Sequence, residues 1–138
     1  MSVHAIINRW AALPFRYGLD CCQFAGEVIE DIAGRNPMAA FAYENRPQAM
    51  AIIEEYGSLR AAITATLGEP IPVREARDGD ALLVDLRACL PRMAELIGDE
   101  IVGVAWRDRC VVRTSTGVTD WPMSRATACW SAESCRAP

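Results

Sequence analysis

The sequence predicts an α+β domain in which helices come first and an antiparallel sheet follows. Up to about residue 68, apolar residues recur at the three- and four-residue spacing of amphipathic helices. From Pro70 onward the pattern changes to short apolar runs separated by turn residues, which is typical of strands. A chain of 138 residues, 51% of them hydrophobic, can bury one real core. We therefore expect a single domain over residues 1–138, helical over about 2–68 and stranded over about 70–131.

Each predicted helix begins after a capping residue or at a proline and ends at a glycine or proline. Ser2 can cap the first helix, and Pro14 ends it. Asp20 and Gln23 have the spacing of a capping box at the start of the second. The predicted helical segments are 3–13, 21–33, 47–56 and 59–67.

The predicted strands are shorter and lie in the second half of the chain. They occupy 78–86, 101–106 and 109–113, with one or two shorter strands at 117–122 and 126–130. A short turn at Asp108-Arg109 predicts that the two central strands form a hairpin. Residues 87–100 show no clear period, and we expect a loop there with about one helical turn.

Composition excludes several classes of partner. The net charge is −4 and the 14 basic residues form no stripe, which argues against nucleic acid and anionic membranes. No apolar run approaches the roughly 18–20 residues of a membrane span. The six cysteines form no C-x-x-C pair, so we expect reduced, mostly buried thiols and no cofactor. One alternative stays open, a metal or cluster site, for which four cysteines would have to converge in space. These are Cys89, Cys110, Cys129 and Cys135.

Cys21 stands at a chemically special position. If Asp20 caps the second helix, Cys21 is its first residue, where free N–H groups and the helix dipole favour a thiolate. Nucleophilic cysteines are often held in this way. Cys22 is rotated by about 100° around the helix axis, so we expect it not to share that environment. The residues alone leave open whether Cys21 is a nucleophile, the remnant of one or a buried thiol.

The stretch "YGLDCCQF" at 17–24 resembles the active-site segment of NlpC-type cysteine peptidases, papain-like enzymes that cut peptidoglycan stem peptides. Their signature has an aromatic residue and a Gly, followed by Asp-Cys-Ser-Gly and an apolar residue. Four residues match it: Tyr17, Gly18, Asp20 and Cys21. Cys22 stands where the family has Ser, and Gln23 where it has Gly. The resemblance implies a papain-like NlpC fold with Cys21 at the nucleophile position.

Further motifs follow in the family's order. Gly79 and Asp80 resemble its Gly-Asp-Leu strand start, and 101–113 resembles the hairpin that carries the catalytic His. Aligned with that hairpin, the His position holds Ile101, and the polar residue that would orient the His falls at or near Arg113. Without a histidine there, the thiol lacks the proton donor that acyl transfer needs. The resemblance therefore implies a degenerate site.

Other candidate residues have simpler interpretations. The only histidine of the sequence, His4, is expected at the surface of the first helix. Arg113 is expected to be a solvated charge at a strand end, the alternative being a place beside Cys21 as its counter-ion. Three tryptophans are expected to pack in the sheet and core rather than to line a ligand site. These are Trp106, Trp121 and Trp130.

The resemblance is closest to the short NlpC-like proteins encoded among the tail genes of long-tailed bacteriophages. It implies a structural tail-tip or tail-assembly component, made in the host cytoplasm and built into the virion tail within a hetero-oligomeric assembly. The implied partners are tail-hub proteins, with peptidoglycan as a further partner. The alternative is an active peptidoglycan endopeptidase or amidase. Cys21 would then be its nucleophile, with a base that is unidentified or supplied by a neighbouring chain.

Overall fold

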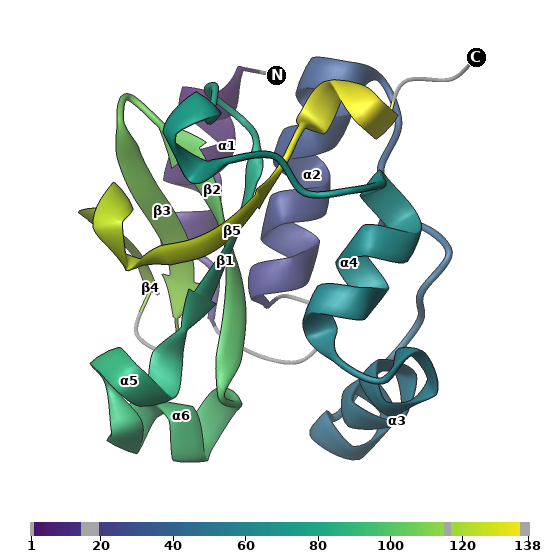
Figure 1. Cartoon of the computed structure of the whole chain (residues 1–138). Helices are drawn as coiled ribbons and strands as arrows, with labels where there is room; N and C mark the ends of the chain where they lie inside the picture. Colours follow the sequence, from purple (N-terminus) through teal and green to yellow (C-terminus); the bar gives the residue numbers. More distant parts are fainter. Residues whose placement is uncertain (1, 15–19, 115–116, 136–138) are drawn as a thin grey trace.

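The computed structural model describes residues 2–14, 20–114 and 117–135. The first half of the described chain is helical, and a five-stranded antiparallel sheet follows (Figure 1). The helices are α1 (Val3–Ala11), α2 (Cys21–Ala33), α3 (Arg46–Tyr56), α4 (Leu59–Leu67), α5 (Leu86–Cys89) and α6 (Pro91–Ile97). The strands are β1 (Ala81–Asp85), β2 (Glu100–Trp106), β3 (Arg109–Thr114), β4 (Gly117–Pro122) and β5 (Ala126–Trp130). The predicted α+β class is confirmed, and so are the four helices of the first half.

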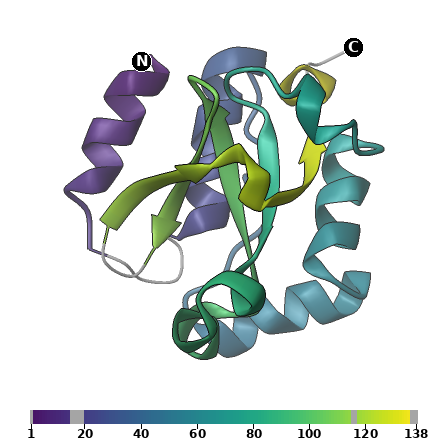
Figure 2. The same cartoon turned by 60° about the vertical axis from the view of Figure 1, so that its left-hand side comes forward.

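Strands lie in the order β4-β3-β2-β1-β5, so the chain leaves one edge of the sheet after β4 and returns at the other as β5. Side chains alternate between the two faces. Leu83, for example, packs in a cluster with α1, α2 and α4, whereas its neighbours Leu82 and Val84 pack in a second cluster with α5 and α6. Figure 2 shows α2 behind the sheet, with α1 and α4 toward opposite sides of it. The sheet is therefore covered on both faces.

Local caps explain where the helices begin. Ser2 accepts a hydrogen bond from the Ala5 N–H, and Ser58 accepts one from the Ala61 N–H. Asn45 caps α3 in the same way, so this helix begins at Arg46, one residue before the predicted start. Side-chain caps of this kind satisfy main-chain donors that have no partner within the helix.

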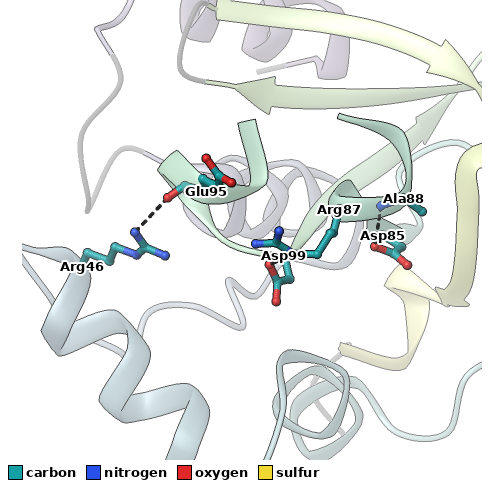
Figure 3. Close-up of polar contacts among 6 residues, drawn as sticks. All are labelled: Arg46, Asp85, Arg87, Ala88, Glu95 and Asp99. Atoms are coloured by element: carbon teal, nitrogen blue, oxygen red, sulfur yellow. Dashed lines mark hydrogen bonds and ion pairs between the residues drawn. The ribbon is translucent and has the colours of Figure 1, made fainter. Parts of the chain in front are cut away.

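Residues 87–100 differ from the expectation of a loop. They contain most of α5 and all of α6. Asp85 caps α5 by accepting from the Ala88 N–H at 3.2 Å, and Arg87 pairs with Asp99 at 2.7 Å (Figure 3). Leu86 and Ala94 are both buried in the second cluster. Helices this short have no visible period, and their stability comes from packing rather than propensity.

The β2–β3 hairpin is confirmed, but its turn lies one residue earlier than predicted. Trp106 pairs with Arg109, so the turn residues are Arg107 and Asp108, both with positive φ. Two consecutive left-handed residues form the type I′ turn that matches strand twist. Asn or Gly is preferred at such positions, which is why the Arg-Asp pair was misplaced.

The Gly-Asp pair before β1 has a structural explanation. Gly79 has φ +92°, and a Cβ there would lie 1.6 Å from Ile32 Cδ1 of α2. The carboxylate of Asp80 is buried and accepts from the N–H groups of Arg77 and Ala132, each at 2.9 Å. The pair therefore lets β1 start close to α2 and ties it to the segment after β5.

Candidate functional site

Asp20 organises the N-terminus of α2. Its Oδ1 accepts from the Cys22 N–H at 3.1 Å, from the Gln23 N–H at 3.2 Å and from the Tyr43 hydroxyl at 2.9 Å. The side chain is buried. The predicted cap is confirmed, and it fixes Cys21 as the first residue of α2.

Cys21 and Cys22 border one cavity of about 130 Å³ between α2, α3 and α4. A hydrogen bond with Cys21 raises the pKa of Cys22 well above the ordinary thiol value, and burial raises it further. The expectation that Cys22 would not share the environment of Cys21 is therefore wrong. Side chains of the first helical turn lean toward the N-terminus, and this cavity extends around that end of α2. Because its pKa is raised, Cys22 stays a neutral thiol.

Tyr43 belongs to the same site, although nothing in its sequence surroundings indicated it. Burial raises the pKa of its phenol, and the nearby Cys22 and Asp20 raise it further, while a hydrogen bond with Gln23 acts in the opposite direction. The hydroxyl therefore stays protonated and donates to Asp20. The hydrogen bond between Tyr43 and Asp20 holds the segment before α3 against the start of α2. The two residues are 23 positions apart in the sequence, so a local pattern could not indicate this contact.

Ile101, the residue aligned with the catalytic His of NlpC-type peptidases, also borders the cavity. Its side chain packs in the second cluster with Val84 and Leu86, and Cys21 packs against this cluster as well as against the first. Because side chains of a strand alternate, Glu100, Val102 and Val104 lie on the other face of β2 from Ile101, and Val102 and Val104 pack in the first cluster with α2. If the alignment with the NlpC-type hairpin were shifted by one residue, the histidine position would fall on Glu100 or Val102, on the other face of the strand.

Glu100 is a second site residue that sequence reasoning missed. It borders the same cavity as Cys21 and is half-buried. Burial raises the pKa of its carboxyl, with further contributions from Asp85 and Asp99 and an opposing one from Arg60. The sequence did not indicate Glu100 because this residue, the first of β2, ends the segment 87–100 that was expected to be a loop.

Arg113 is fully buried, so the expectation of a solvated charge is wrong. Its Nη1 donates to the Trp10 carbonyl at 3.1 Å, and its Nη2 donates to the Leu13 carbonyl. The guanidinium lies 5.9 Å from the Trp10 ring centre. Carbonyls at the end of a helix lack partners within it and attract a cation. Arg113 thus holds the end of α1 against β3, and burial lowers its pKa.

Arg113 also borders the cavity that contains Cys21, so the structure brings Cys21, Ile101 and Arg113 to one cavity. In the described part of the chain, Arg113 Nε is the one buried side-chain nitrogen or oxygen without a hydrogen-bond partner. Tyr17, the remaining predicted site residue, lies outside the described residues. His4 is exposed on α1 and does not border the cavity.

The alternative metal site is not formed. Cys110 and Cys129 pack in the second cluster, whereas Cys135 packs in the first, and Cys89 lies on α5. All six cysteines are free. In the described ranges, no three His, Cys, Asp or Glu side chains lie close enough to hold a metal ion.

All three tryptophans pack as expected within or against the clusters. Trp130 is fully buried, and its indole donates to Thr64 at 3.2 Å. Trp106 packs against the first cluster. Trp121 packs against the second, with the Arg125 guanidinium 4.9 Å from its ring centre. None of the three borders the cavity beside Cys21.

Residues 1–132 match the family described as "Domain of unknown function (DUF6950)", and the chain belongs to this family. No curated protein matches the sequence. Among the described helices, none is both long and apolar enough to cross a membrane.

Proposed function

We propose that this protein is a structural component of the tail tip of a long-tailed bacteriophage, with an NlpC-type fold whose peptidase site is degenerate. The resemblance of 17–24, 79–80 and 101–113 to NlpC-type sequences supports the family of origin. The order of elements, with Cys21 opening a helix that packs on an antiparallel sheet, is compatible with it. Tail-hub proteins are the proposed partners, and the host cytoplasm is the proposed place of synthesis before assembly into the virion.

One observation carries the degenerate-site part of the proposal. No imidazole borders the cavity that contains Cys21, because the only histidine of the sequence is His4, exposed on α1. Acyl transfer to a thiol needs a group that takes its proton and later protonates the leaving amine. Ile101, at the position aligned with the catalytic His, and Val102 beside it border the cavity and can do neither.

The test compares wild type with Cys21→Ser in two assays. The first follows release of peptides from purified peptidoglycan, and the second follows complementation of a phage that lacks this gene. We expect no release by either protein and equal plaque yields. Release by wild type that Cys21→Ser abolishes would contradict the degenerate site. Normal plaques without the gene would contradict the structural role.

A second function, an active peptidoglycan endopeptidase or amidase, is favoured by one specific observation. Glu100 borders the same cavity as Cys21, and its raised pKa suits a carboxyl that exchanges protons nearer neutral pH. In this alternative Cys21 is the nucleophile and Glu100 the general acid and base. Glu100→Gln would then abolish hydrolysis as completely as Cys21→Ser. The same assay, run also on assembled tails, separates the two functions and detects a base supplied by another chain.

A further inference from the structure

Helix α3 lies at the surface and has little packing of its own. None of its 11 residues is buried, and it carries the two large hydrophobic residues of the described chain that are exposed, Met50 and Tyr56, each at 40%. Beyond α4, its described contacts include the Phe41–Tyr56 ring pair and a hydrogen bond from Arg46 to the Glu95 carbonyl (Figure 3). An isolated helix of this length is marginal in water. A partner on its outer face would supply contacts that the described chain does not.

The exposed side chains of α3 are arranged as a ridge with a groove beside it. Arg46, Met50 and Glu54 follow one another at intervals of four residues, so they form one row along the helix surface. All three are exposed, with Met50 at the rim of the cavity described above. Pro47 and Ala51, each one position later, are also exposed and small. The ridge therefore has a positive end, an apolar centre and a negative end.

The charges at the two ends of this ridge are complementary to each other. Among the described residues, no hydrogen bond or ion pair engages the carboxylates of Glu54 and Glu55. Arg46 donates to the Glu95 carbonyl at 3.2 Å through one of its five N–H donors. A helix with the same order of charges, running antiparallel to α3, would place a carboxylate on Arg46 and a guanidinium on Glu54. The α3 helix of a second copy has this order.

We propose that α3 is a self-association surface, on which the α3 helices of two copies of this chain pack antiparallel about a two-fold axis. The two Met50 side chains meet at the axis, and Arg46 of each copy pairs with Glu54 of the other. Packing of four-residue ridges gives a crossing angle of about 50°, the commonest class between helices. The contact is isologous, so the same ion pair forms twice. The inference goes beyond the proposed tail function, because it concerns two copies of this chain and requires no other protein.

The size of the surface sets the strength of the dimer. An 11-residue helix is about 16 Å long, so one face of it covers less than the roughly 800 Å² per partner of a stable dimer. We therefore expect a weak, rapidly exchanging dimer with a Kd on the order of 0.1 mM. Sedimentation equilibrium of the full chain between about 10 µM and 1 mM measures this Kd. Added salt should raise it, because the two ion pairs are exposed.

A charge swap tests the arrangement of the two helices. Arg46→Glu and Glu54→Arg each turn two attractive pairs into two repulsive ones, so each variant alone should associate about 10-fold more weakly than wild type. In an equimolar mixture of the two variants, the mixed dimer regains two attractive pairs. Its affinity should return to within about 3-fold of the wild-type value.

Both substitutions suit the helix in which they lie. A carboxylate in the first turn of α3 and a guanidinium in the last turn are favourable to the helix dipole, so both variants should fold like wild type. Circular dichroism and thermal unfolding verify this. Glu30→Arg is the matched control, because Glu30 is exposed in the last turn of α2 and the change of charge is the same as in Glu54→Arg. This control should associate like wild type.

Four results would overturn the proposal. A wild type that stays monomeric at about 1 mM would show that α3 does not bind a second copy, and would leave a different protein as the partner of this face. A wild-type dimer that neither charge reversal weakens would use another surface. A mixture that associates no better than the single variants would exclude the pairs between Arg46 and Glu54. The same holds if Glu30→Arg weakens the dimer as much as Glu54→Arg.

Discussion

Replacing Asp20 by alanine tests how the start of α2 is held together. The substitution removes the acceptor shared by the N–H groups of Cys22 and Gln23 and by the Tyr43 hydroxyl. The two N–H groups lose their cap, and the partly buried hydroxyl loses its partner. Because both losses fall on one atom, the effect should exceed that of an ordinary cap mutation.

The size of the effect follows from these contacts. Loss of an N-cap costs about 0.5–2 kcal/mol. A hydroxyl left without its partner in a buried position costs about 1–3 kcal/mol more. We therefore expect Asp20→Ala to lower the free energy of unfolding by about 2–4 kcal/mol. Asp20→Asn keeps an acceptor oxygen at the same position and caps as well as Asp, so its loss should stay below about 1.5 kcal/mol.

Urea unfolding followed by far-ultraviolet circular dichroism measures these differences, provided that the slopes stay equal. A double-mutant cycle with Tyr43→Phe isolates the contact between Tyr43 and Asp20. We expect a coupling of about 1.5–3 kcal/mol, the range for a hydrogen bond to a charged group. The account fails if Asp20→Ala costs less than about 1 kcal/mol, if Asn and Ala are equivalent, or if the coupling is zero.

Three further predictions concern the core and its ionisable groups. Gly79→Ala should lower the free energy of unfolding in urea by about 2–4 kcal/mol, because it combines a positive φ with a clash against Ile32. A loss below about 1 kcal/mol would contradict this geometry. Burial holds the pKa of Tyr43 above its ordinary value of about 10, so the unfolded chain releases this proton first. Stability should therefore fall as pH rises past 10, and more shallowly in Tyr43→Phe; parallel curves would refute this. Burial raises the pKa of Cys110 and of Cys129 to about 12. Mass spectrometry should find both unalkylated at pH 8 in the native protein and alkylated in urea, and rapid native labelling would show that they are accessible.

The parts of the fold that sequence reasoning predicted correctly are those with local signals. A capping side chain such as Ser58 acts on the next turn of its own helix, and Gly34 adopts the left-handed conformation that ends α2. α5 and α6 have no comparable signal. Their stability comes from Leu86 and Ala94, which pack against strand residues distant in sequence. A pattern within one segment cannot contain that information.

The candidate site divides along the same line. The place of Cys21 at the start of α2 could be predicted because Asp20 lies next to it. The contribution of Tyr43 could not, since it depends on how the segment before α3 folds back. The burial of Arg113 was missed for a related reason. A charged residue at the end of a strand is ordinarily solvated, and only the position of α1 supplies the carbonyls that permit its burial.

The residues that match the peptidase signature also have structural roles that are independent of catalysis. Asp20 caps α2 and binds Tyr43, Asp80 ties β1 to the segment after β5, and Gly79 allows close packing on α2. Loss of hydrolytic activity would leave each of these roles in place. A match at these positions therefore cannot by itself distinguish an enzyme from a protein in which these residues serve folding alone. The distinction depends on the β2 residues that border the cavity beside Cys21, which here are Glu100, Ile101 and Val102, and Glu100→Gln is the substitution that tests it.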